Sequence, residues 1–179
     1  MNMLKRMFRP SDVEIWRKLE SEANTRFEKG DFWHRDKVEV THDGWTITLD
    51  TYFSAASKVE YTRMRAKLPI QADFRFLITR EGLLSEIAKL FGAQDIQIGD
   101  AEFDKLFMIK GNNEKLIKAM LQNAKIRQLL LGQPEVHFAL TPENELLFAV
   151  PVIIKDLYRL KQLFELFTET LEFLCETDT

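Results

Sequence analysis

The chain has 179 residues, of which 45% are hydrophobic and 30% are charged, and these proportions exclude a wholly disordered polypeptide. Its net charge of −3 provides no general attraction for nucleic acid, and its single cysteine, Cys175, excludes an intramolecular disulfide and a cysteine-based zinc site. No uncharged run reaches the roughly 20 apolar residues that a spanning helix needs, so we predict no transmembrane segment and a cytoplasmic location.

Residues 1–9 combine basic and apolar side chains, but no apolar core or cleavage pattern of a secretory signal follows them. We therefore expect a flexible basic N-terminus over 1–9 and a single α+β domain over 10–179. Ser11 and Glu14 form a capping-box pattern, which predicts a first helix that ends at Gly30. Its buried side is predicted at Val13, Trp16, Ala23 and Phe27.

Beyond the first helix the apolar residues recur at every second position, which is typical of strands with one buried face. Asp43-Gly44 is a dipeptide favoured in tight hairpins. We predict strands on both sides of this turn, the second of them with Trp45, Ile47, Leu49, Thr51 and Phe53 on one face. Further strands are predicted over 58–66 and 73–79, giving an antiparallel sheet with one wet face.

The second half of the chain alternates between helical and extended patterns. A helix is predicted over 81–91, and a strand over 105–110 that is apolar on both sides and therefore central. A helical stretch over 114–131 is expected to break at Gln122-Asn123-Ala124. Residues 136–150 have the pattern of a hairpin that turns at 141–144.

The last predicted element, Ile153 to Cys175, is an amphipathic helix. Its apolar residues lie three and four positions apart, on one stripe, and at about 1.5 Å per residue it is long enough to cross a small sheet. The sequence thus predicts an antiparallel-rich sheet of about six strands packed against this helix, with other helices at its sides.

A resemblance to a known group of proteins begins at Ile98. The pattern acidic-Phe-acidic-x-x-Phe at Glu102 to Phe107, a helix ending in Leu129 to Leu131, and the hairpin after it resemble a family of uncharacterised bacterial domains. The resemblance covers about residues 98–151 and places Phe103, Asp104 and Phe107 in a strand. Members of that family often carry membrane-spanning helices ahead of the domain, and this chain has none. The resemblance implies a bacterial protein and no particular activity.

Patterns of catalytic and cofactor-binding sites are weak in this sequence. Asp100, Glu102 and Asp104 have the spacing of the first ligands of a calcium loop, but the required glycine and the final glutamate are missing, so we interpret them as turn-capping acids. No Gly-rich phosphate loop or nucleophile elbow occurs. We predict no cofactor, metal or catalytic residue, and a buried, inert Cys175. The three histidines, His34, His42 and His137, are expected on the surface, and an enzyme would require His34 or His42 to meet Asp50 or Asp73 in one cleft.

Two groups of residues are candidates for partner binding. Arg63, Arg65 and Arg75 belong to the most basic part of the predicted sheet, where Tyr52 and Tyr61 are interleaved. Basic side chains between aromatic ones suit nucleic acid, but nearby acidic residues cancel much of the charge, so nucleic acid is not favoured. The second group adds apolar area to the last helix outside its main stripe, and consists of Leu163, Leu166 and Phe173. Such residues indicate either burial on two sides or self-association.

The sequence therefore favours a non-catalytic cytoplasmic protein-interaction module, with a protein partner or a second copy as the ligand. The alternative is a protein that binds a small apolar ligand in a pocket between the sheet and the last helix. A cavity lined by Phe53, Phe74, Phe138 and Phe164 would favour that alternative.

Overall fold

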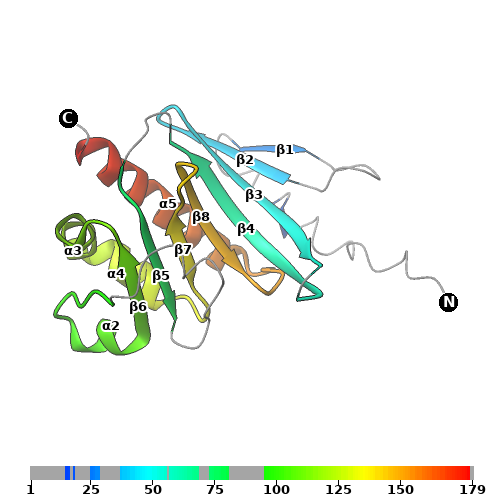
Figure 1. Cartoon of the computed structure of the whole chain (residues 1–179). Coiled ribbons are helices and arrows are strands. Elements are labelled where there is room, and N and C mark those ends of the chain that lie inside the picture. Colours follow the sequence, from blue (N-terminus) through cyan, green and yellow to red (C-terminus); the bar gives the residue numbers. More distant parts are fainter. Residues whose placement is uncertain are drawn as a thin grey trace.

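The structure is a computed structural model that describes residues 15, 16, 18, 25–28, 37–55, 57–68, 73–80 and 95–177. In this part of the chain, eight strands form one sheet with the order β1-β2-β3-β4-β8-β7-β5-β6 (Figure 1). Every neighbouring pair is antiparallel. The predicted α+β class, an antiparallel sheet against a long C-terminal helix, is confirmed, with more strands than the six expected.

The helices and strands follow one another along the chain largely in the predicted order. The strands are β1 (Thr25–Glu28), β2 (Lys37–His42), β3 (Trp45–Ser54), β4 (Val59–Lys67), β5 (Phe76–Arg80), β6 (Phe107–Gly111), β7 (His137–Leu140) and β8 (Glu145–Val150). The helices are α2 (Ala101–Leu106), α3 (Glu114–Gln122), α4 (Ala124–Leu131) and α5 (Leu157–Thr177), and Ile15, Trp16 and Lys18 are also helical. The predicted helix over 81–91 lies outside the described residues, as do Ser11 and Glu14.

The first predicted helix is wrong at its C-terminal end. Residues 25–28 form β1, which pairs with β2 from Thr25↔Val40 to Glu28↔Lys37. Local pattern does not reveal this strand, because its pairing depends on the edge that β2 offers once the β2–β3 hairpin has formed. That hairpin agrees with the prediction: Asp43 and Gly44 have φ angles of 45° and 84°, as a two-residue turn with positive φ requires.

The strand predicted over 105–110 begins later and lies elsewhere in the sheet. Residues 101–106 form α2, in which Phe103 is fully buried and the Asp100 carboxylate accepts a hydrogen bond from the Phe103 N–H at 3.1 Å. Phe103 and Asp104 are thus helical rather than extended. β6 is the last strand of the sheet, not a central one.

The outer edge of β6 is covered, which explains why its sequence resembles that of an internal strand. The Ile96 N–H donates to the Ile109 carbonyl at 2.8 Å, and the Asp95 carboxylate accepts from the Ile109 N–H at 2.8 Å. The strand that is buried on both faces is β5 instead, where Phe76, Leu77, Ile78 and Thr79 are each 1% exposed or less. The face of the sheet opposite α5 is therefore only partly exposed to solvent.

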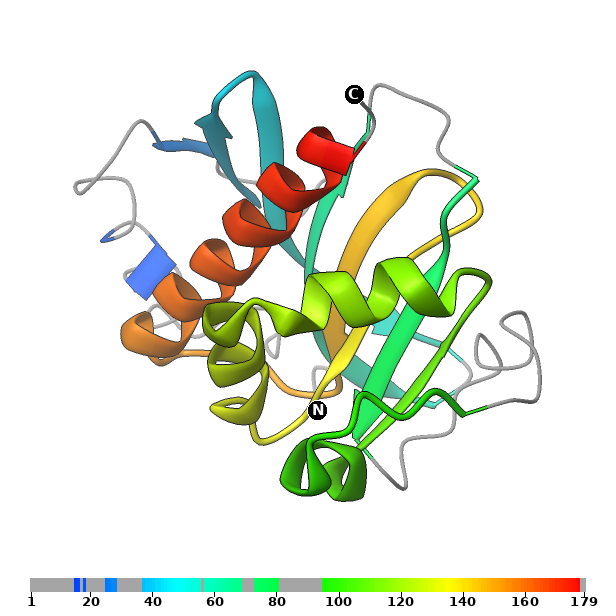
Figure 2. The ribbon, with the colours of Figure 1, turned by 90° about the vertical axis from the view of Figure 1, so that its left-hand side faces the viewer.

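The helices α3 and α4 are separated by Asn123, as predicted. The Asn123 side chain accepts hydrogen bonds from the backbone N–H groups of Lys125 and Ile126, at 2.9 and 3.4 Å, and so caps α4. Both helices lie beside α5 in front of the sheet in Figure 2. Asn123 thus ends α3 and starts α4, which packs against α5.

The long helix α5 begins at Leu157, four residues later than predicted. Asp156 provides its cap by accepting from the N–H groups of Tyr158 at 2.9 Å and Arg159 at 3.3 Å. The preceding segment is tied to β4, because the Thr62 hydroxyl donates to the Val152 carbonyl at 2.6 Å and accepts from the Ile154 N–H at 2.8 Å. These contacts aim α5 across the sheet, as Figure 2 shows.

Aromatic rings fill the space between the sheet and α5. The ring of Phe138 on β7 lies 5.5 Å from that of Phe76 on β5 and 5.7 Å from that of Phe167 on α5. All three residues are fully buried. The rings therefore hold the two layers together at the centre of the molecule.

Candidate functional site: the tyrosine–arginine surface

The candidate site lies on the face of the sheet opposite α5, over β3 and β4. Alternation along β3 places Ile47 and Leu49 towards the core, so Asp50 and Tyr52 point the other way. In β4 the same alternation buries Thr62, Met64 and Ala66 and turns Tyr61, Arg63 and Arg65 outward. We call these five outward residues, Asp50, Tyr52, Tyr61, Arg63 and Arg65, the tyrosine–arginine surface.

Asp50 organises the charged half of this surface. Its carboxylate accepts two hydrogen bonds from Arg63, from Nε and from one terminal nitrogen, each at 2.8 Å. A third comes from Arg65 at 3.1 Å. Register makes this possible, because Asp50 pairs directly with Arg63 and Thr48, two residues earlier, pairs with Arg65. The hydrogen bond from Arg63 to Asp50 is the main cause that raises the pKa of Arg63 above its ordinary value.

The two tyrosines form the aromatic half. Tyr52 and Tyr61 are cross-strand partners whose ring centroids lie 5.0 Å apart with an angle of 16° between the planes. The Arg63 guanidinium lies 5.1 Å from the centre of the Tyr52 ring. Partial burial, with a smaller contribution from Tyr61, raises the pKa of Tyr52 above 10.0. Tyr52 therefore stays a neutral phenol at physiological pH.

Arg75, the third predicted arginine, lies apart from this group. It immediately precedes β5, and its guanidinium donates to the carbonyls of Phe74 at 2.6 Å and Pro142 at 3.3 Å. It therefore holds the loop between β7 and β8. The sequence could not separate it from Arg63 and Arg65, because β7 and β8 are inserted between β4 and β5 in the sheet.

The residues that suggested a second, exposed stripe on the last helix face the protein interior. Leu163 and Leu166 are fully buried, and Phe173 is half-buried and packs against the core. The stripe is thus explained by burial on two sides, and Leu163 and Leu166 are unable to bind a partner in this structure. The prediction for Cys175 is also wrong, because this thiol is exposed near the end of α5.

Of the two histidines that the enzyme hypothesis names, His42 lies in the described part of the chain. His34 lies outside the described residues, and His42 contacts Asp43 and Glu172 rather than Asp50 or Asp73. His137 is half-buried on β7, where burial lowers its pKa below 6.5. In the sequence nothing near His42 points to Glu172, which is 130 residues away.

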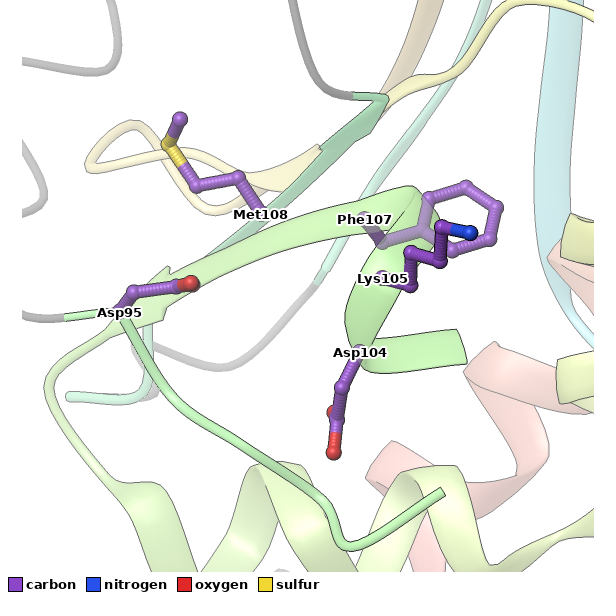
Figure 3. A pocket seen from close by; sticks show the side chains of 5 residues that line it. All are labelled: Asp95, Asp104, Lys105, Phe107 and Met108. Atoms are coloured by element: carbon purple, nitrogen blue, oxygen red, sulfur yellow. The ribbon is translucent and has the colours of Figure 1, made fainter. Parts of the chain in front are cut away.

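Three of the acids between residues 95 and 104 bind backbone N–H groups, namely Asp95, Asp100 and Asp104. Asp104 accepts from the N–H groups of Ile98 and Gly99, each at 2.9 Å, and Asp95 accepts from Ile109 as described above. Figure 3 shows these carboxylates at a pocket of about 290 Å³ that Lys105, Phe107 and Met108 also line. The interpretation as turn-capping acids is confirmed for Asp100 and Asp104, with α2 rather than a strand as the element that Asp100 caps.

Two of the Phe residues proposed to line an apolar cavity, Phe74 and Phe138, have ring centroids 5.6 and 5.5 Å from that of Phe76. Phe53 is 49% exposed near the end of β3, whereas Phe138 is buried in the ring cluster. Three pockets lined entirely by described residues, including the one in Figure 3, contain none of Phe53, Phe74, Phe138 and Phe164. These pockets are lined by polar and charged residues together with a few apolar ones.

Comparison with known proteins gives one informative result. No protein family matches the sequence, and no characterised protein matches it. Among solved structures, the mycobacterial trehalose monomycolate transport factor A, TtfA, superposes with a TM-score of 0.60 at 12% identity, over 93% of this chain and 96% of that one. The chain shares the fold of this transport factor. Identity of 12% carries the likeness no further than the fold.

Among the described residues, no helix is both long enough and apolar enough to cross a bilayer. This agrees with the prediction for these residues.

Proposed function

We propose that the chain is a non-catalytic accessory protein in lipid transport that binds a protein partner on the tyrosine–arginine surface. The structural neighbour is a transport factor, and the two folds match over almost their whole lengths. This likeness supports the proposed role in lipid transport. The observation that carries the proposal is the ordered array of Tyr52, Tyr61, Arg63 and Arg65 on a sheet face that no described helix covers (Figure 1).

The residue types of this surface suit a protein interface. Tyrosine and arginine are enriched among the residues that contribute most binding energy, because they provide a large contact area together with hydrogen-bond donors. Here Asp50 and the stacked rings already fix the side chains of Arg63 and Tyr52. Less conformational entropy is therefore lost when a partner binds.

The charge of the surface favours protein over nucleic acid. Two arginines face two acids, since Asp50 binds both and Glu145 lies 3.8 Å from Arg65. Arg65 is the more accessible of the two arginines, because 37% of its side chain is exposed against 29% for Arg63. A partner with one carboxylate for Arg65 and an apolar side chain for the tyrosine rings fits this pattern.

The proposal extends to a cytoplasmic location and to membership in the uncharacterised bacterial family that residues 98–151 resemble.

Photo-crosslinking tests the surface. A photoreactive amino acid replaces Tyr61 in cells of the source organism, and in a matched strain it replaces Gln128, which is exposed on α4 on the helical side. We expect a single adduct of defined mass from position 61 that Arg65→Glu abolishes, and none from 128. Equal adducts from both positions, or an adduct that is insensitive to Arg65→Glu, would contradict the proposal.

A complementation experiment tests the pathway. Cells in which Arg65→Glu replaces the native protein are expected to deliver less labelled lipid to the cell surface, whereas Glu143→Gln cells deliver the normal amount. Immunoblots of both strains establish that protein levels are equal. Unchanged delivery in the Arg65→Glu strain would remove the link to lipid transport.

The second candidate function is direct binding of a lipid between the sheet and α5. The structural neighbour favours it, because that protein is a trehalose monomycolate transport factor. The rings of Phe76, Phe138 and Phe167 do not favour it, since they occupy the space between the layers. Native mass spectrometry of the chain purified from its own cells decides between the two. A bound mass in the range of a lipid would favour the second candidate.

A further inference from the structure

His42, Asp43 and Glu172 bring together three side chains that commonly bind metals. His42 ends β2, Asp43 opens the turn to β3, and Glu172 lies in the last turns of α5, so two distant elements contribute. One ligand atom from each residue lies within 4.8 Å of the other two. We propose that this cluster is a binding site for a divalent transition-metal ion such as Zn²⁺.

The distances are long for direct hydrogen bonds, since the contact of His42 Nε2 with Glu172 Oε1, at 3.4 Å, lies near the outer limit of one. Both carboxylates approach the same nitrogen, His42 Nε2, which carries at most one proton: Asp43 Oδ2 at 3.5 Å and Glu172 Oε1 at 3.4 Å. A charge-assisted hydrogen bond between such groups is about 2.7–2.9 Å long. In a tetrahedral shell with bonds of about 2.1 Å, neighbouring donor atoms are about 3.4 Å apart. The two separations from His42 Nε2 match the second arrangement, and the Asp43 and Glu172 oxygens lie within 4.8 Å of one another.

The set of donors also selects the class of ion. One imidazole and two carboxylates, without a thiolate, suit Zn²⁺, Co²⁺ or Mn²⁺. Without an ion, the two carboxylates of Asp43 and Glu172 repel one another at short range. A divalent cation removes this repulsion.

The three proposed ligands belong to ordered parts of the structure, the β2–β3 hairpin and α5. His42 pairs with Trp45 across the hairpin, whose turn is fixed by the positive φ angles of Asp43 and Gly44. Glu172 is carried by a part of α5 that is held to the sheet by the buried Leu171 and Leu174. Little rearrangement is therefore needed to close the shell around an ion.

The site is open to solvent on one side. The side chains of His42, Asp43 and Glu172 are 43%, 79% and 51% exposed, respectively. Three protein ligands with an open fourth position leave room for water or for an acidic group of another molecule. The bound ion would also fasten the β2–β3 hairpin to the end of α5.

Titration of the full-length, tag-free chain with ZnCl₂ by isothermal calorimetry tests the site. We expect one equivalent to bind and the melting temperature to rise. Glu172→Gln and Asp43→Asn are expected to weaken binding by about a hundredfold, since even outer partners of metal ligands are worth about 10–100-fold. Glu102→Gln is the control, because it removes the same charge from an exposed position on α2.

Spectroscopy gives a second readout. Co²⁺ bound in place of Zn²⁺ is expected to show the intense visible absorption of a tetrahedral site, and His42→Ala is expected to abolish it. All variants should keep the circular dichroism of the native chain, since the three ligands are exposed. No binding of Zn²⁺, or binding that Glu172→Gln and Asp43→Asn leave unchanged, would overturn the proposal.

Discussion

Asp50 is the residue on which the tyrosine–arginine surface depends. It is only 8% exposed, yet its charge is satisfied by two guanidinium groups. Its removal leaves Arg63 without its strongest partner and frees the side chain to leave the Tyr52 ring. The order of the surface and the stability of the sheet are thus linked at one carboxylate.

For this reason we expect Asp50→Asn to lower the free energy of unfolding by about 1.5–3 kcal/mol, the range for hydrogen bonds to charged groups. Most of the loss should come from Arg63, because Arg65 is more exposed and its ion pair is weakened by solvent. Urea denaturation at neutral pH measures the change. Glu143→Gln, at an exposed turn, should leave stability unaltered, and an equal loss in both variants would refute the central role of Asp50.

His137 should make stability depend on pH. Burial lowers its pKa in the folded state below the ordinary value of 6.5. The unfolded chain therefore takes up a proton near pH 6.5 while the folded chain does not, so stability is complete above pH 6.5 and falls as the pH drops through the folded pKa. We expect His137→Gln to show a smaller drop in melting temperature between pH 7.5 and 5.5 than the native chain. A drop of the same size in both proteins would exclude His137 as the source.

At the scale of the elements, hydrogen bonds of single side chains decide where each helix begins. Asp100, Asn123 and Asp156 accept from the first backbone N–H groups of α2, α4 and α5. The sequence predicts the break at Asn123, but it places the start of α5 at Ile153. The apolar stripe continues through residues 153–156, so periodicity alone does not show that this segment lies outside the helix and is bound to β4.

The cap of α5 can be tested directly. Asp156→Ala should lower the free energy of unfolding by about 0.5–2 kcal/mol, because two backbone N–H groups lose their acceptor. Asp156→Ser should recover most of the loss, since serine is also a good cap. Urea denaturation measures both variants. If serine gave no recovery, the loss would have to be assigned to a cause other than capping.

The difference between local sequence patterns and contacts with distant parts of the chain also explains which strands could be predicted. The β2–β3 and β7–β8 hairpins carry strict alternation and turn residues, and both are confirmed. The sequence misplaces β1 and β6, because their positions depend on partners elsewhere in the chain: the edge of β2 for β1, and residues 95–96 for β6. Apolar residues on both sides of a strand thus do not distinguish a central strand from a covered edge.

The candidate site was only partly predictable for a similar reason. The sequence grouped Arg63, Arg65 and the tyrosines in the most basic part of the sheet, but their convergence on Asp50 depends on the β3–β4 register. Arg75 and the cluster of His42 with Glu172 depend on strand order and on the path of α5. No local pattern in the sequence predicts contacts between residues that lie so far apart in the chain.

At the scale of the whole molecule, the buried rings of Phe76, Phe138 and Phe167 join both layers. Phe138→Ala should therefore cost about 3–5 kcal/mol and destabilise sheet and helices together. Far-UV circular dichroism and tryptophan fluorescence, to which Trp45 beside the core contributes, should report the same urea midpoint in this variant. Two separate midpoints would contradict the prediction of a single domain.

The covered edge at β6 has a consequence for behaviour at high concentration. An edge strand with unpaired backbone N–H and C=O groups can pair with a strand of another molecule, which is the first step towards fibrils. At Ile109 both backbone groups are already engaged by the chain itself, through Asp95 and Ile96. Polymerisation through this end of the sheet would first require residues 95–96 to detach from β6. This segment therefore protects the edge against such pairing.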